Sequence, residues 1–470
     1  MPRDRLYLVQ GPPGVGKTTL ALQFLLEGAR TGEPGLYITL SETKEELEAV
    51  ASSHGWNLAA VNLFELSAME EQLKGAADTT FFHPSEIELH RTTAVLLEAV
   101  EAAKPARVVF DSLSEMRMLA ETPLRYRRQI LHLKQFFAGR KCTVLLLDDS
   151  SAGEADLQVE SLAHGVIMLS RSAPDYGVTR RQLAIQKIRG VKFREGNHDL
   201  ILRKGGAVVF PRLVAAEYGR TFQEETVSSG IPAFDTLLGG GLDRGTSSMF
   251  MGPPGSGKST LCMRFAVTAA ERGEKVLYFT FDETLQTAIT RAEKLGFNLA
   301  RHRENGRLKL QQIDPAEITP GELAHHIMTA VTDDGVRMIV IDSINGYFTA
   351  MPEERHLILQ LHELLAFLNQ QGVLTLMIIA QHGFVGTMHS KIDLSYLSDT
   401  VVLTRYFETE GAVRKAVSIM KKRSGNHERT IRELKIGPGG VDVGPTLAHF
   451  HGILTGVPTS ERATTAPPAT

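Results

Sequence analysis

Short apolar runs alternate with amphipathic segments along most of the chain. In the first half the runs have the length of buried strands and lie at 6–9, 36–40, 108–110, 143–147 and 165–169. Between them, apolar residues recur at helical spacing over 22–29, 45–53, 92–103 and 126–137. This alternation predicts an α/β fold, in which helices flank a mainly parallel sheet on both faces. Ligands of such sheets bind beyond the carboxyl ends of the strands.

The same order of features occurs twice in the sequence. The segment GPPGVGKTT, residues 11–19, recurs 241 residues later as GPPGSGKST, residues 252–260. Further matching pairs follow in the same order, namely 35–43 with 276–284, 54–58 with 295–299, 107–112 with 338–343, and 187–190 with 421–424. Because the order never changes, the sequence predicts a tandem duplication of a domain of roughly 230 residues.

The repeats set the expected domain boundaries. We predict a first domain over 1–213, a linker over 214–226 and a second domain over 227–457. The tail at 458–470 is rich in Thr, Pro and Ala, and we expect it to be disordered. The second copy has a lead-in of about 25 residues before its glycine-rich segment, whereas only ten residues precede Gly11. We therefore expect the first domain to lack this lead-in, or the true start to lie upstream of Met1.

Composition excludes several classes of protein. The 470 residues are 43% hydrophobic and 22% charged, which rules out wholesale disorder. Lys and Arg number 51 against 54 Asp and Glu, so the net charge of −3 does not demand nucleic acid or an anionic membrane as partner. Two cysteines, Cys142 and Cys262, exclude a disulfide framework and fit a reducing cytoplasm. No apolar run approaches the ~20 residues of a membrane-spanning helix.

The glycine-rich segments carry the clearest chemistry. Each fits the pattern G-x-x-x-x-G-K-[ST] between a predicted strand and a predicted helix, which is the P-loop. Its backbone N–H groups surround phosphate oxygens, its lysine reaches the β- and γ-phosphates, and its hydroxyl binds Mg²⁺. The residues expected to bind ATP are Gly11, Gly14, Gly16, Lys17, Thr18 and Thr19, and in the second copy Gly252, Gly255, Gly257, Lys258, Ser259 and Thr260.

Acidic residues follow two strands of each copy. Asp111 and Asp342 end an apolar run, which suits a metal role together with Thr18 and Ser259, although a turn aspartate is the simpler alternative. Glu42 and Glu283 follow the second strand, where a carboxylate can orient or deprotonate a nucleophile. The alternative for both glutamates is the acidic first turn of a helix.

Basic pairs lie late in each copy. Lys187 with Arg189, and Lys421 with Arg423, are too far along the chain to belong to the P-loops. Such cations can reach a γ-phosphate across a subunit interface, as arginine fingers do. The alternative is a solvated basic turn, and the repeated Lys-x-Arg favours the functional interpretation.

Together these motifs resemble the KaiC family of bacterial ATPases, which belongs to the RecA superfamily. The resemblance covers about residues 1–457 and includes both P-loops, the Asp282-Glu283-Thr284 segment and the Lys-x-Arg pairs. It implies two tandem RecA-like domains, Mg·ATP as ligand, and a cytoplasmic homohexamer with ATP at subunit interfaces. It also implies slow ATP hydrolysis in the first domain, autophosphorylation in the second, and a small KaiB-type partner.

The transfer from the family is uneven. Its adjacent pair of catalytic glutamates is Ser41-Glu42 in the first copy and Asp282-Glu283 in the second. Its phosphorylated Ser-Thr pair is Ser395-Tyr396 here, so the two-step phosphorylation of the family does not carry over whole. The candidate acceptor is Ser395 alone, or Ser395 together with Ser398. The tail does not resemble a KaiA-docking peptide, so a KaiA-type partner is not expected.

We accordingly predict a Mg·ATP-dependent ATPase with serine autokinase activity in its second domain, acting in signalling or timing. One alternative is an ATP-dependent binding switch that retains no phosphate on the protein. A second is a RecA-type DNA-handling ATPase, which the near-neutral charge and the lack of a basic loop bearing aromatic residues disfavour.

Overall fold

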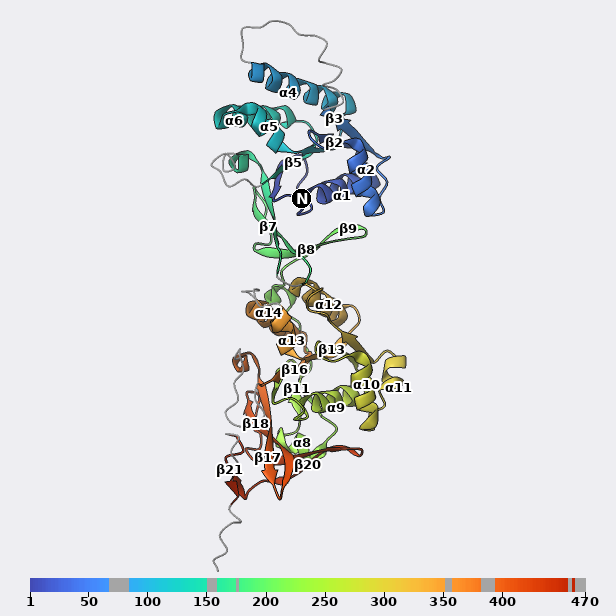
Figure 1. Cartoon of the computed structure of the whole chain (residues 1–470), viewed down its shortest axis with the longest axis vertical. Coiled ribbons are helices and arrows are strands. Elements are labelled where there is room, and N and C mark those ends of the chain that lie inside the picture. The colour runs from blue at the N-terminus through green and yellow to red at the C-terminus, as the bar shows by residue number, and fades with distance from the viewer. Residues whose placement is uncertain are drawn as a thin grey trace, which may run out of the picture. The chain divides into compact units, whose positions relative to one another are not determined.

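The chain forms two compact units, Met1–Arg212 and Leu213–Thr470 (Figure 1). The structure is a computed structural model that describes residues 1–66, 84–149, 159–174, 177–350, 357–381, 394–454 and 459–460. Each unit contains a nine-stranded, mainly parallel sheet flanked by helices. These are two tandem RecA-like P-loop domains, as the sequence predicts.

The sheet of the first unit has the order β3-β2-β4-β5-β1-β6-β7-β8-β9. Six strands are parallel, and the last three join through antiparallel pairings. The strands are β1 (Leu6–Gly11), β2 (Gly35–Thr39), β3 (Val61–Glu65), β4 (Arg107–Asp111), β5 (Thr143–Asp149), β6 (Gly165–Ser172), β7 (Arg180–Ile188), β8 (Asn197–Arg203) and β9 (Gly206–Phe210).

Helices cover both faces of this sheet because the central strands are apolar on both sides. On β1, Leu6 and Leu8 pack in one core and Tyr7 and Val9 in the other. The helices are α1 (Lys17–Arg30), α2 (Lys44–Ser53), α4 (Pro84–Ala103), α5 (Leu113–Ala120) and α6 (Pro123–Phe137). The strands and helices expected for this half are all present, and the described residues add α5 and the strands β3, β7, β8 and β9.

The second unit repeats this arrangement with the order β14-β13-β15-β16-β12-β17-β18-β19-β20. Its strands are β12 (Ser247–Gly252), β13 (Lys275–Thr280), β14 (Leu308–Gln312), β15 (Val336–Asp342), β16 (Leu374–Ala380), β17 (Thr400–Thr409), β18 (Ala412–Lys422), β19 (Arg432–Gly437) and β20 (Gly440–Thr446). Its main helices are α9 (Lys258–Glu271), α10 (Leu285–Lys294), α11 (Leu299–Glu304), α12 (Pro320–Thr332), α13 (Ile344–Ala350) and α14 (Leu357–Gln370).

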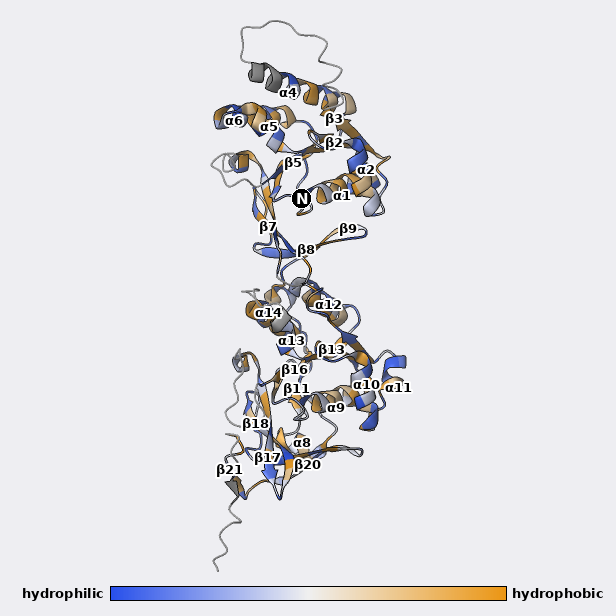
Figure 2. Cartoon of the chain, in the orientation of Figure 1, coloured by the Kyte–Doolittle hydropathy of each residue, from blue (hydrophilic) through white to orange (hydrophobic). Residues whose placement is uncertain are grey.

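The lead-in of the second unit is part of its core. It forms β10 (Thr226–Val227), α8 (Pro232–Leu237) and β11 (Leu242–Asp243), and Phe234 of α8 packs edge-to-face on Phe265 at a centroid distance of 6.2 Å. Figure 2 shows largely hydrophilic α10 and α11, which border the site described below, and a more apolar α14. Thr459–Ser460 forms β22, paired with β21 (Phe450–His451), and residues 461–470 lie outside the described part.

Candidate nucleotide-binding sites

Both P-loops begin at the carboxyl end of the central strand of their sheet. Gly16 and Gly257 precede α1 and α9 with φ of 108° and 107°, a left-handed conformation that side chains rarely adopt. A Cβ at Gly257 would lie 2.6 Å from Ile436 Cδ1, and one at Gly16 would lie 3.0 Å from Leu202 Cδ1. The glycines are therefore required here, and they let the loop amides turn toward a phosphate.

The P-loop lysines fold back over their own loops. Lys258 Nζ donates to the carbonyls of Gly252 at 2.9 Å and Pro253 at 2.7 Å. Lys17 Nζ makes the same contact to Gly11 at 2.6 Å. Burial lowers the pKa of Lys258 to about 8, and the nearby carboxylate of Asp342 partly opposes this shift. A bound phosphate would supply the counter-charge that carbonyls cannot.

A hydroxyl and a buried carboxylate face each other beside each P-loop. Thr18 Oγ1 lies 3.2 Å from Asp111 Oδ2, and the side chain of Ser259 is hydrogen-bonded to Asp342. Burial raises the pKa of both aspartates, and these hydrogen bonds act in the opposite direction. The hydroxyl–carboxylate oxygens are hard ligands of the kind that Mg²⁺ uses beside phosphates, so the residues present fit this ion.

Two tyrosines support these aspartates from behind. Tyr278 OH donates to Asp342 Oδ2 at 2.7 Å, and Tyr37 OH donates to Asp111 Oδ2. Both rings are fully buried. Neither tyrosine is among the residues predicted from the sequence, although both occupy the same place in the repeat (35–43 and 276–284), which is a signal that could identify them.

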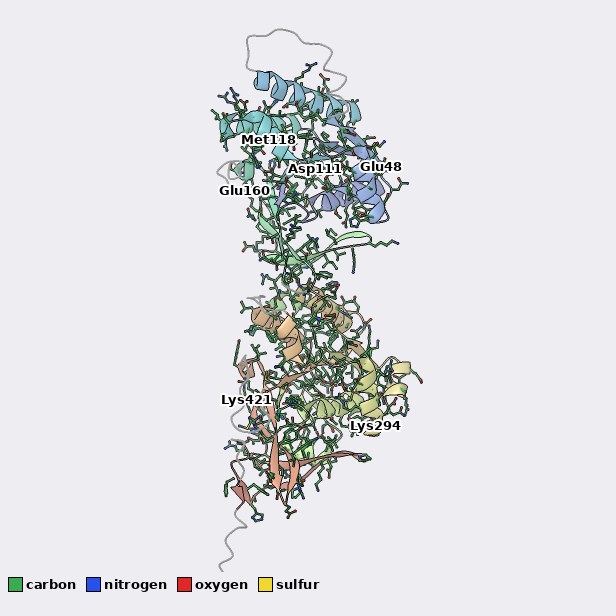
Figure 3. The ribbon with its side chains drawn as sticks, in the orientation of Figure 1. Glu48, Asp111, Met118, Glu160, Lys294 and Lys421 are labelled. Atoms are coloured by element: carbon green, nitrogen blue, oxygen red, sulfur yellow. The ribbon has the colours of Figure 1, made fainter. Side chains whose placement is uncertain are left out.

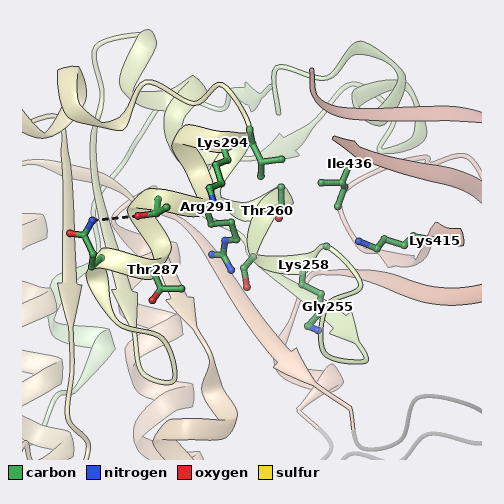
Figure 4. A pocket seen from close by; sticks show the side chains of 13 residues that line it. Gly255, Lys258, Thr260, Thr287, Arg291, Lys294, Lys415 and Ile436 are labelled. Atoms are coloured by element: carbon green, nitrogen blue, oxygen red, sulfur yellow. Dashed lines mark hydrogen bonds between the residues drawn. The ribbon is translucent and has the colours of Figure 1, made fainter. Parts of the chain in front are cut away.

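A cavity of about 660 Å³ opens on the second P-loop (Figure 4). Its size suits a nucleotide. It is lined by Gly255, Gly257, Lys258, Ser259, Thr260, Gln286, Thr287, Thr290, Arg291, Lys294, Leu295, Lys415 and Ile436. Five of the six P-loop residues predicted for this copy thus line one cavity, together with residues of α10, β18 and β19.

The glutamates differ in their partners. Glu283 Oε2 lies 2.9 Å from Arg291 Nη2, whereas Glu42 Oε2 is buried and has no hydrogen-bond partner among the described residues. The position of Arg291 is taken in the first unit by Val50. Burial and the charges of Asp111 and Glu46 raise the pKa of Glu42 to about 7.

Asp282 has a contact that Ser41 does not make. Ser343 Oγ donates to Asp282 Oδ2 at 2.5 Å. A Cβ at Gly346 would lie 2.5 Å from Asp282 Oδ1, so the carboxylate fits closely against α13. The second unit therefore holds two carboxylates with defined partners, Asp282 and Glu283, where the first has Glu42 alone.

The first unit has an acidic residue beside its P-loop that was not predicted from the sequence. Asp149 Oδ1 lies 2.7 Å from Lys17 Nζ. Asp149 ends β5 opposite Gly11, and the register places Ala380 at the same point opposite Gly252. The P-loop lysine of the first unit is therefore paired with a carboxylate, while the second unit has a methyl group at that position.

The late basic pairs contact the segment before the last parallel strand of their own unit. Lys421 Nζ donates to the carbonyls of Ser395 at 3.1 Å and Ser398 at 2.7 Å, and Arg423 donates to Tyr396 O at 2.9 Å. Ser398 is fully buried, while Tyr396 is 56% exposed. Lys187 and Arg189 make the matching contacts in the first unit, to the carbonyls of Glu160 and Ser161.

Comparisons with known proteins agree with this geometry. A family model described as the KaiC ATPase matches residues 1–214 and 227–448. Circadian clock oscillator proteins KaiC of Thermostichus vulcanus and Synechococcus elongatus are 25% and 26% identical to the chain, which aligns over 98% of its length and 89% of theirs. None of the described helices is long and apolar enough to span a bilayer. The chain belongs to the KaiC family of ATPases.

Proposed function

We propose that both units bind Mg·ATP and hydrolyse it slowly, and that the second unit also transfers the γ-phosphoryl group to Ser395. The observation that carries this proposal is the duplicated cradle, in which a left-handed glycine, a buried lysine and a hydroxyl–carboxylate pair meet at one strand end. Mg²⁺ held by Thr18 with Asp111, or by Ser259 with Asp342, would neutralise charge on the transferred phosphoryl group.

For hydrolysis, a water oxygen attacks the γ-phosphorus while the bond to the β,γ-bridging oxygen breaks. The water's proton passes to a carboxylate, and ADP leaves with the electron pair of the broken bond. Glu42 is the base that we propose in the first unit. In the second unit we favour Asp282 as the base, because Arg291 already binds Glu283 and would keep that carboxylate in an orienting role.

Autophosphorylation differs only in the nucleophile. Ser395 Oγ forms the new bond to phosphorus, its proton passes to the same carboxylate, and ADP leaves. We propose that the ATP is bound by a neighbouring subunit of a homohexamer, and that Lys421 and Arg423 of the subunit that carries Ser395 reach its γ-phosphate. Lys187 and Arg189 would act in the same way between neighbouring first units. The names of the KaiC relatives support a role of this activity in slow signalling or timing.

A second candidate is an ATP-driven binding switch without phosphorylation. The contacts of Lys421 and Arg423 to the carbonyls of Ser395 and Tyr396 favour it, because they hold the acceptor segment within its own unit. ATP would then turn over at both sites, and partners would respond to the nucleotide state.

One experiment separates the two candidates. The protein is incubated with Mg·ATP, its intact mass is measured, and the peptide 394–400 is mapped. We expect one added phosphate on Ser395 that is absent in Lys258→Ala and in Ser395→Ala. Release of free phosphate with no added mass on the protein would overturn the autokinase and leave the binding switch.

A further inference from the structure

The two units place different residues at one structurally equivalent position. In the first unit Tyr7 pairs with Gly165 of β6, and in the second Ser248 pairs with Thr400 of β17. Because Tyr7 and Ser248 correspond in the repeat, Gly165 corresponds to Thr400. Counting back five residues from each matches Glu160 with Ser395.

The contacts of the basic pairs confirm this match independently. Lys187 Nζ donates to the carbonyl of Glu160, and Lys421 Nζ donates to the carbonyl of Ser395 at 3.1 Å. The carbonyl of the next residue in each segment accepts from the arginine of the pair: Arg189 donates to Ser161 O at 2.7 Å, and Arg423 donates to Tyr396 O at 2.9 Å. Figure 3 labels Glu160 and Lys421 in their respective units. In each unit a lysine and an arginine, Lys187 with Arg189 or Lys421 with Arg423, therefore bind the equivalent stretch of backbone, and we call each pair a lysine–arginine clamp.

The charge at this position differs between the units. Glu160 places a carboxylate beside the clamp of the first unit. Burial and Arg189 lower the pKa of Lys187, and the negative charge of Glu160 acts against them. Ser395 brings only a hydroxyl, but a phosphoryl group on it would carry a charge of about −1.5 to −2 and three strong acceptor oxygens.

A neighbouring carboxylate distinguishes the two cations of the second clamp. Arg423 Nη1 pairs with Asp399 Oδ1 at 3.3 Å, and the residue at the place of Asp399 in the first unit is His164. Lys421 Nζ lies within hydrogen-bond distance of the backbone of residue 395 itself. Lys421 is therefore the principal cation for a new charge at this position.

We propose that Lys421, assisted by Arg423, is the receiving site for a phosphoryl group on Ser395. Glu160 gives the first unit a permanent negative charge at this position, which the second unit acquires only when Ser395 is phosphorylated. This inference rests on the phosphorylation of Ser395 proposed above. A paired phosphoserine would hold the segment 394–399 against β17 and β18, and would engage the lysine that is otherwise proposed to serve a neighbouring nucleotide.

The test replaces phosphorylation by a fixed charge, so it does not depend on autokinase activity. Full-length Ser395→Glu and Ser395→Gln are compared by hydrogen exchange of the amides at 394–400, each with Lys421 intact and as Lys421→Met. We expect these amides to exchange about fivefold more slowly in Ser395→Glu than in Ser395→Gln, and we expect this ratio to shrink at high salt. In the Lys421→Met background the two variants should exchange at the same rate. Lys435→Met, which removes an exposed cation on β19, is the matched control and should retain the difference.

Equal exchange in Ser395→Glu and Ser395→Gln would overturn the inference, and so would a difference that survives Lys421→Met. If Lys421→Met does not fold, the salt dependence of the Glu–Gln difference decides in its place, since a difference independent of salt contradicts an ion pair. In the first unit, Glu160→Gln should speed exchange at 159–164 by a similar factor. If the Glu–Gln difference depends on Lys421 but Ser395 carries no phosphate after incubation with Mg·ATP, the autokinase proposal alone is refuted. If Ser395 is phosphorylated but the Glu–Gln difference does not depend on Lys421, the receiving site alone is refuted.

Discussion

Arg291 pairs with Glu283 across 2.9 Å, whereas Val50 takes the position of Arg291 in the first unit, where the equivalent glutamate is Glu42. One substitution on the helix after the second strand thus gives two equivalent glutamates different electrostatic surroundings. In the second unit the guanidinium opposes the effect of burial on the pKa of Glu283. In the first unit burial acts with the charges of Asp111 and Glu46, opposed only by Lys17, and raises the pKa of Glu42 to about 7.

This raised pKa predicts a pH dependence of stability in the nucleotide-free first unit. Between its ordinary value of 4.5 and about 7, Glu42 binds a proton in the folded state but not in the unfolded state. Its contribution to stability is therefore present below pH 4.5 and lost as the pH rises to about 7. The sole tryptophan, Trp56, lies in the first unit, so thermal unfolding followed by its fluorescence from pH 4.5 to 7.5 reports this unit.

Glu42→Gln should remove this part of the pH dependence, and Val50→Arg should reduce it by supplying the cation that the second unit has. Measurements are made without Mg²⁺, because a bound ion would add its own charge. Parallel pH profiles for the wild type and Glu42→Gln would show that Glu42 has an ordinary pKa.

Asp149 predicts weaker ATP binding in the first unit. Its carboxylate occupies Lys17 and places negative charge where a triphosphate must approach. Asp149→Ala should raise the affinity of the first site by about three- to tenfold, since the pair is partly exposed and screened. Titration with a fluorescent ATP analogue in a Lys258→Ala background measures this site alone.

The reciprocal change, Ala380→Asp in a Lys17→Ala background, should weaken the second site by a similar factor. An affinity that does not change, or that falls, in Asp149→Ala would mean that the carboxylate does not compete with phosphate and supports binding instead.

Tyr278→Phe should weaken Mg²⁺-dependent binding at the second site. The change removes a 2.7 Å hydrogen bond to the buried Asp342, which costs about 1–3 kcal/mol for a charged acceptor. The pKa of Asp342 should rise further, so the loss of Mg·ATP affinity should be larger at pH 6 than at pH 8. Tyr406→Phe is a control, because Tyr406 OH donates to the P-loop carbonyl of Pro254 at 2.9 Å and not to Asp342. An equal loss in both variants would contradict a specific role of Tyr278.

The sequence predicts the parts of the sites that depend on local chain geometry. The P-loop glycines and lysines lie within nine residues of each other, and Asp111 and Asp342 are marked by the apolar strands that they end. Asp149 and Arg291 could not be found in this way, because each lacks a counterpart in the other copy. The contact of Asp149 with Lys17 also requires β5 to lie beside β1, and the contact of Arg291 with Glu283 depends on which face of α10 turns toward that glutamate. The repeat reveals neither arrangement.

We propose that each chain has two separate nucleotide sites built on Lys17 and Lys258. Equilibrium binding of ATP with Mg²⁺ tests it most directly, with the number of nucleotides bound per chain measured in the wild type, in Lys17→Ala, in Lys258→Ala and in the double variant. We expect two nucleotides in the wild type, one in each single variant and none in the double variant. Two nucleotides in either single variant, or any bound in the double variant, would contradict the assignment.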